Sequence, residues 1–139
     1  PEVPLVVHTD LFKNDPQAVV GLARAMDKAL VFAKANPDAA LAIMKQAFPP
    51  EHEDAAFTRK YMDQAIFMSW PLDNQPFGQM SLSGAQALVD VLVDPTSPSG
   101  LEKSFDVSPF FTNDLISQIN DFDQAAVEQQ AKASTLTYP

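Results

Sequence analysis

Two helix-start signals close together decide the fold class. They lie in the stretch NDPQAVVGLARAMDKALVFAKANPDAALAIMKQAFPP, residues 14–50. Asp15 can cap a helix whose first residue is Pro16. Asn36 and Pro37 repeat that signal one helix later. Apolar residues recur at spacings of three and four through both segments, and two prolines end the second. The stretch therefore predicts two helices with almost no loop between them, which must turn sharply and pack as a pair.

Shorter helices are expected along the rest of the chain. The apolar pattern predicts a third helix over about residues 51–69. Ser83 and Gln86 form a capping box for a fourth helix, and Thr112 can cap a last short one. After Phe122 the chain is rich in Gln and Ala with few apolar anchors, which predicts a frayed tail or a weak helix.

The first residues have a strand-like rather than a helical composition. Four apolar residues, mostly β-branched, lie close together before a polar turn, which predicts a short buried strand at residues 3–7. A single strand needs sheet partners, and the remaining sequence offers almost none. The predicted class is mainly α, with one strand that lacks partners.

Composition and charge restrict the classes of function. The 139 residues include 9 Lys plus Arg and 18 Asp plus Glu, which gives a net charge of −9. Such a chain lacks the basic patch that binds nucleic acid and the cations that bind anionic lipid, so we predict no nucleic-acid partner. No apolar run approaches the roughly 18 residues of a membrane span. The absence of cysteine excludes a disulfide framework, a thiolate zinc site and a cysteine nucleophile.

Candidate catalytic groups are sparse. The two histidines are His8 and His52, and the four scattered glycines cannot build a phosphate-binding loop. His52 lies in the acidic segment 51–54, whose side chains could offer metal ligands. However, consecutive residues on a helix point in different directions, and an acidic first turn suits the helix dipole. We therefore predict a structural role for this segment, no cofactor or metal, and no enzymatic activity.

Trp70, the only tryptophan, is the most informative aromatic residue. It lies where the third helix is expected to end, close in sequence to Phe67 and Phe77. A tryptophan at a helix end is typical of a core or interface anchor. It is also suited to stack on a heteroaromatic or quaternary ligand. The residues alone leave both interpretations open.

Two long stretches resemble a known family. They are VVHTDLFKNDPQAVVGLARAMDKALVFAKANPDAALAIM at residues 6–44 and FGQMSLSGAQALVDVLVDPTSPSGLEKSFDVSPFFTNDLI at residues 77–116. Both are similar to the carboxy-terminal half of the NMT1/THI5-like solute-binding proteins of ABC transporters. Members of that family bind aminopyrimidine thiamin precursors, nitrate, sulfonates or taurine. The similarity covers most of residues 3–120 and lies in the order and spacing of modest motifs.

The resemblance implies a two-lobed α/β fold that closes around its ligand by hinge motion. Residues 1–122 would form the helical carboxy-terminal part of one periplasmic-binding-protein type II-like lobe, and residues 123–139 a polar tail. Residues 3–7 would be the hinge strand. The implied function is capture of a small polar or heteroaromatic solute for an ABC permease. The implied place is the periplasm, or the outer surface of a Gram-positive cell through a lipid anchor.

The resemblance also bears on single residues and on partners. It implies ligand contacts for Trp70, by aromatic stacking, and for Thr9 and Asp10, which follow the hinge strand. Because the helices would lack the sheet that they cover, we expect their apolar faces to be exposed and to drive formation of a homo-oligomer. The chain opens at Pro1 without a methionine, so we expect a mature chain, a processed product or a fragment.

Two alternatives stay open. The pyrimidine-precursor synthases of the same family are enzymes, but they need more histidine and cysteine residues than this chain has. A free-standing acidic helical module would instead use the wide apolar stripes to bind a protein partner.

Overall fold

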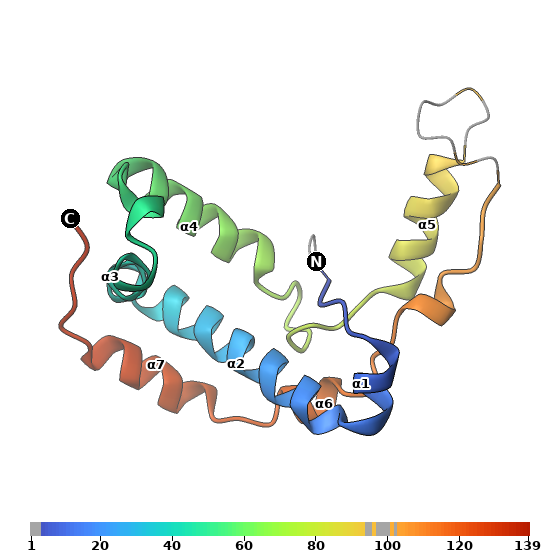
Figure 1. Ribbon diagram of the computed structural model, residues 1–139, viewed down its shortest axis with the longest axis horizontal. Coiled ribbons are helices and arrows are strands. Elements are labelled where there is room, and N and C mark those ends of the chain that lie inside the picture. The colour runs from blue at the N-terminus through green and yellow to red at the C-terminus, as the bar shows by residue number, and fades with distance from the viewer. Residues whose placement is uncertain (1–3, 94–95, 97–100, 102) are drawn as a thin grey trace.

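Helices dominate the chain. The computed structural model describes residues 4–93, 96, 101 and 103–139. Helices make up 65% of these residues and no strand occurs among them, which confirms the mainly α class. The elements shown in Figure 1 are α1 (Thr9–Asn14), α2 (Pro16–Ala35), α3 (Pro37–Ala47), the 3-10 turn η1 (Pro49–His52), α4 (Ala55–Ser69), α5 (Leu82–Leu92), the 3-10 turn η2 (Ser108–Phe110), α6 (Ile116–Ile119) and α7 (Gln124–Ala133). None of these described helices is long and apolar enough to cross a bilayer.

The predicted helix pair is confirmed as α2 and α3. The Asp15 carboxylate accepts a hydrogen bond from the Ala18 N–H and begins α2. The Asn36 side-chain oxygen accepts one from the Ala39 N–H and begins α3. A proline follows each cap, at the position where its missing N–H costs nothing. Since one residue separates the helices, the chain turns sharply between them.

The core lies where α2 meets α3 and α7. Its most deeply buried large side chains are Val20, Val31 and Leu41, each at most 2% exposed. Helix α7 runs alongside α2 in Figure 1 and buries Ala131 against the body. The Asn36 side-chain N–H donates to the Ala131 carbonyl at 2.9 Å. One asparagine therefore caps α3 and also fastens the α2–α3 joint to the end of α7.

The chain after residue 122 is held against the body. Asp123 begins α7 by accepting a hydrogen bond from the Ala126 N–H. Beyond α7 the chain continues toward α3 and α4, where Tyr138 is only 6% exposed. Of the two expectations for this segment, the helix is confirmed and the frayed tail is wrong. The division of the chain at residue 122 stays a prediction.

The strand predicted at residues 3–7 is wrong for the part that the structure describes. Residues 4–8 are irregular, and the first residue of the predicted strand lies outside the described range. Leu5 is 43% exposed and Val6 86% exposed. A strand forms when a neighbouring strand satisfies its backbone hydrogen bonds, and no described segment forms a strand beside it. These residues are apolar, but no strand that could pair with them lies in the described part of the chain.

Two predicted helix boundaries differ from those found. The third helix is divided into η1 and α4, because Asp54 leaves the helical conformation and caps α4 by accepting from the Phe57 N–H. Helix α6 follows Leu115 without a side-chain cap. Thr112, predicted as that cap, instead accepts a hydrogen bond from the Asp114 N–H in the preceding loop.

The capping box predicted for the fourth helix is also wrong. Helix α5 begins two residues earlier than expected, since Ser81 rather than Ser83 is its cap and accepts from the Gly84 N–H. The Gln86 side chain, expected to complete the box, donates instead to the Phe105 carbonyl. Both serines can cap a helix, so the local sequence alone does not choose between them.

Helix α5 stands apart from the other helices. Figure 1 shows it projecting away from the body formed by α2, α3, α4 and α7. The structure describes all of its residues, and none of them is buried. No shared core therefore protects the backbone hydrogen bonds of α5 from solvent.

We expect the backbone amides of α5 to exchange with solvent far faster than those of α2. A helix without buried side chains opens locally at little free-energy cost, whereas amides in a core helix exchange mainly through global unfolding. Hydrogen exchange followed by mass spectrometry, on peptides from residues 82–92 and 19–33, measures the difference. Equal protection of the two peptides would show that α5 shares the core.

Candidate functional site

Trp70 is half-buried at the end of α4. It is the C-cap residue, and its N–H donates to the Ile66 carbonyl at 2.9 Å. Its ring meets the buried Phe77 ring edge-on, with centroids 5.2 Å apart. The Lys34 Nζ, from α2, lies 3.2 Å from the centroid of the indole ring. Trp70 therefore joins the end of α4 to α2 and to the loop that follows.

A hollow of about 160 Å³ opens beside Trp70. Helix α2 contributes Val31 and Lys34 to its lining, and α7 contributes Glu128 and Lys132. Lys132 and Glu128 form an ion pair with N and O 3.7 Å apart. Ligand pockets typically enclose at least about 300 Å³, so this hollow suits a small ion or a few water molecules better than an organic solute.

Lys34 changes what the Trp70 ring can do. An ammonium group over an indole ring is attracted by the ring quadrupole, by about 0.5–1 kcal/mol at exposed sites. A flat solute could stack on that face of the ring only after Lys34 moves away. In this conformation the contacts of Trp70 are those of a packing residue.

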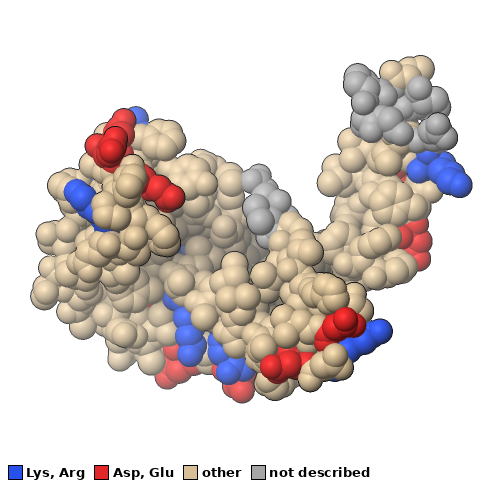
Figure 2. Space-filling model, viewed as in Figure 1, with Lys and Arg blue, Asp and Glu red and all other residues tan. Residues whose placement is uncertain are grey.

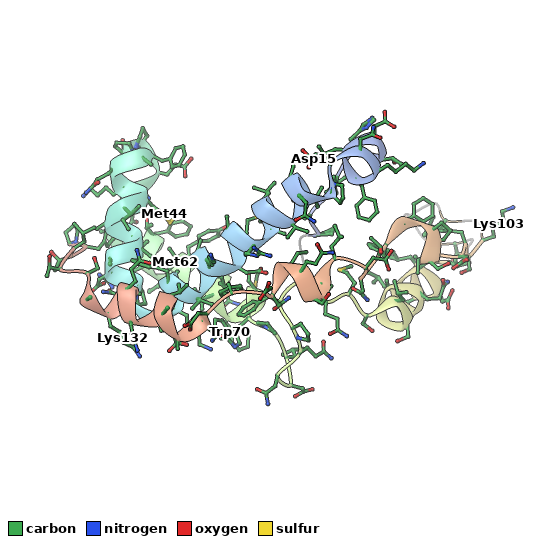
Figure 3. All side chains as sticks on the ribbon, turned by 90° about the horizontal axis from the view of Figure 1, so that it is seen from below. Asp15, Met44, Met62, Trp70, Lys103 and Lys132 are labelled. Carbon is green, nitrogen blue, oxygen red and sulfur yellow. The ribbon has the colours of Figure 1, made fainter. Side chains whose placement is uncertain are left out.

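Thr9 and Asp10 lie in the first turn of α1, and both are exposed. The His8 Nδ1 accepts a hydrogen bond from the Asp10 N–H at 3.2 Å, and the Asp10 carboxylate is 3.7 Å from the same nitrogen. Neither residue is among the described residues that line the hollow beside Trp70. Figure 3 places α1 beyond the Asp15 label and away from the Trp70 label. The structure does not bring the three predicted ligand residues together, and their ligand role stays a prediction.

His52 is the only buried polar residue in the described part of the chain, at 4% exposed. Its Nδ1 lies 3.1 Å from the Tyr138 hydroxyl, and the two rings meet edge-on with centroids 5.6 Å apart. Among the described residues no group of three or more His, Asp or Glu side chains could hold a metal ion. His52 thus packs against the end of the chain.

Tyr138 is held by basic residues from three elements. Lys45 of α3 and Arg59 of α4 lie over its ring, at 5.7 Å and 5.6 Å from the centroid, and His52 of η1 faces its hydroxyl. Arg59 also donates to the Tyr138 carbonyl at 3.3 Å and forms an ion pair with Asp38. The sequence analysis did not predict this cluster. The one signal that could have indicated it is Tyr138, an aromatic residue in the predicted polar tail, residues 123–139.

A second hollow, of about 360 Å³, lies along α2 between α3, α4 and α7. We call it the α2 groove. Figure 3 shows Met44 and Met62 on the side of α2 away from Trp70 and Lys132. The groove exists because the α2 residues at its floor have small side chains, while larger apolar side chains surround it. Its lining includes Ala29, Ala33, Ile43, Met44, Met62 and Val127. Sequence reasoning identified the apolar stripes of these helices but not the groove between them.

One carboxyl group on α2 is poorly solvated. Burial raises the pKa of Asp27 from 3.8 to about 6. Its Oδ2 is shielded from water and has no hydrogen-bond partner among the described residues. The charged form is therefore disfavoured in the folded chain relative to the unfolded chain.

We expect Asp27→Asn to stabilise the chain at pH 8 and to have almost no effect at about pH 4. The folded pKa is raised, so the folded state holds the proton more tightly and stability falls as pH rises from about 4 to 6. Because Asp27 is only half-buried, the gain above pH 6 should be about 1 kcal/mol rather than the full value of the shift. Urea denaturation at both pH values measures it, with the exposed Asp63→Asn as control. A gain that does not depend on pH would contradict this explanation.

Comparisons with known proteins identify no relative of this chain. A scan of protein-family models, a search of curated proteins and a search of solved structures each found no match. The resemblance to solute-binding proteins therefore stays an expectation, which rests on the sequences of residues 6–44 and 77–116 alone.

Proposed function

We propose that this chain is part of an extracytoplasmic solute-binding protein that captures a small polar or heteroaromatic solute and delivers it to an ABC permease. The observation that supports this most is the amount of surface that the fold leaves open. The chain exposes 9731 Å², about 2,600 Å² more than the roughly 7,100 Å² expected of a compact monomer of 15.2 kDa. Such an excess is expected when one layer of a fold is missing.

Much of the open surface is apolar. Helices α4 and α5, which are described in full, bury no residue. The exposed large apolar side chains on α2, α4 and α5 include Leu22, Met26, Phe57, Tyr61, Leu88 and Val91. In Figure 2 the charged side chains gather at the edges of the view and leave a broad uncharged surface between them. Helices with such faces are suited to cover another layer, as the helices of an α/β lobe cover a sheet.

The size of the excess favours a lobe over a free-standing interaction module. A standard protein–protein interface covers about 800 Å² on each partner, and the excess here is about three times larger. The exposed apolar side chains of Leu5 and Val6 also fit a strand whose sheet lies elsewhere in a longer polypeptide.

In this proposal the protein carries out no chemistry on the solute. The solute binds between two lobes, and closure of the lobes presents it to the permease. Trp70, Thr9 and Asp10 are the residues of this lobe proposed to contact it, and stacking on Trp70 requires Lys34 to leave the ring. The protein would work in the periplasm, or on the outer surface of a Gram-positive cell through a lipid anchor.

A thermal-shift screen of the complete polypeptide tests the proposal. Aminopyrimidines, nitrate, alkylsulfonates and aromatic carboxylates are the classes to include. A true solute at 100 times its Kd should add about 2.7 kcal/mol of stability. The 139 residues alone should show no shift, because a cleft needs both lobes. Absence of a shift with every class in the complete polypeptide would count against the proposal, as would full binding by the 139 residues alone.

A further inference from the structure

We propose that the described part of residues 80–113 forms an arm that changes its angle to the rest of the chain by bending at two short links. The links are residues 78–79, which lead into the arm, and residues 114–115, which lead out of it. We call these two links the neck. The inference concerns motion within this chain, and it does not depend on solute binding.

Side-chain contacts hold the arm together as a unit. The Gln86 amide of α5 donates to the Phe105 carbonyl at 3.1 Å, and its oxygen accepts from the Val107 N–H at 3.2 Å. Val107 is only 4% exposed. The Phe105 and Phe110 rings meet edge-on, with centroids 5.9 Å apart. The arm therefore has a buried residue of its own and a polar link between α5 and the segment that returns to the body.

An asparagine closes the base of the arm. The Asn113 side-chain oxygen accepts from the Met80 N–H at 2.9 Å, and its side-chain N–H donates to the Met80 carbonyl at 3.0 Å. Both backbone groups of the residue at which the chain enters the arm are thus paired with the residue at which the chain leaves it. The two ends of the arm must therefore move together.

A second asparagine closes the body on the other side of the neck. Asn120, the C-cap of α6, accepts from the Phe77 N–H at 2.9 Å and donates to the Phe77 carbonyl at 3.0 Å. Phe77 is 7% exposed, and its ring packs against those of Trp70 and Phe122. Phe77 therefore belongs to the body, although it lies only three residues before the start of the arm.

The neck between the two asparagines consists of two β-turns. One turn is closed by the Gln79 N–H, which donates to the Pro76 carbonyl at 3.3 Å, and the other by the Ile116 N–H, which donates to the Asn113 carbonyl at 3.1 Å. All neck residues except Leu115 are exposed. Hinges are short segments of this kind, in which a few residues absorb a change in backbone dihedral angles.

The position of the arm leaves it room to bend. Helix α5 makes no extensive packing with any other described helix. Figure 1 shows it projecting away from the body, and in Figure 3 Lys103 of the arm lies at the opposite end of the view from Lys132 of α7. A change of angle at the neck therefore breaks few contacts, whereas a change within the arm or the body would break the contacts described above.

Distances between pairs of spin labels, measured by double electron–electron resonance in the 139-residue chain, test this inference. The chain contains no cysteine, so each pair of labels is attached at two introduced cysteines. Val91→Cys with Gln129→Cys spans the neck. Val91→Cys with Pro109→Cys reports on the arm, and Lys60→Cys with Gln129→Cys reports on the body; all four positions are exposed. We expect the distance distribution across the neck to be at least about twice as wide as the other two.

A variant at the base of the arm tests whether the asparagine holds it together. Asn113→Ala should widen the distribution within the arm and leave the one within the body unchanged, because it removes both hydrogen bonds to Met80. Gln75→Ala, at an exposed position before the neck, should leave all three distributions unchanged.

Three results would overturn the inference. Equal widths for all three pairs would show that arm and body form one rigid unit. A wide distribution within the arm of the parent chain would show that the arm does not move as a unit, and no effect of Asn113→Ala would show that its base is held in another way. None of these results affects the solute screen of the complete polypeptide, so the arm and the proposed function can fail separately.

Discussion

Tyr138→Ala should lower the free energy of unfolding by about 4 kcal/mol. The side chain is 6% exposed and lies between α3, η1 and α4. Its removal leaves a cavity, and it leaves the buried His52 ring without its hydroxyl partner. Urea denaturation followed by far-UV circular dichroism, at about 1 µM chain to limit self-association, measures the loss.

Two control variants separate the contributions of this residue. Tyr138→Phe keeps the ring and should cost about 1 kcal/mol, because it removes one hydrogen bond. Thr137→Ala changes an exposed neighbour and should stay within about 0.5 kcal/mol of the parent chain. If Tyr138→Ala cost no more than Thr137→Ala, the end of the chain would not belong to the folded body.

Leu41→Ala should cost about 3–4 kcal/mol. Leu41 is fully buried in α3, where that helix packs on α2. The shortened side chain loses its apolar contacts and leaves a cavity that the close-packed helices cannot fill. The same urea titration measures this loss, since both variants are compared with one parent chain.

Leu88→Ala is the matched control, because Leu88 is 61% exposed on α5 and should change stability by less than about 0.5 kcal/mol. Leu41→Met keeps the volume, should cost less than about 1.5 kcal/mol, and keeps the transition measurable if the alanine variant is unfolded. Similar losses for Leu41→Ala and Leu88→Ala would place the core elsewhere than between α2 and α3.

The helix pair was predictable because its signals are local. Asp15 and Asn36 cap their helices through hydrogen bonds to N–H groups three residues away, so a short window of sequence contains the whole interaction. The same reasoning placed the fourth helix correctly but chose Ser83 over Ser81 as its cap. Two suitable residues in one turn give the same local signal, and only the folded backbone distinguishes them.

Features that depend on distant residues could not be predicted in this way. The hydrogen bond between His52 and Tyr138 joins positions 86 residues apart, and nothing near either residue indicates the other. The strand at residues 3–7 failed for the related reason that a strand is defined by its neighbour. For the candidate site, the sequence placed Trp70 at the end of a helix but could not show that Lys34 covers its ring.

In the complete polypeptide we expect the open face of α2 to be covered. The 139 residues contain no cysteine, so Met26→Cys places a single thiol in this part of the protein, at a site 53% exposed. We predict that a maleimide labels it at least about tenfold more slowly in the complete polypeptide than in the isolated chain at 1 µM, because labelling of a covered site requires local opening. Gln129→Cys, at an exposed position of α7, should react at the same rate in both. Equal labelling rates for Met26→Cys in the two proteins would contradict the claim.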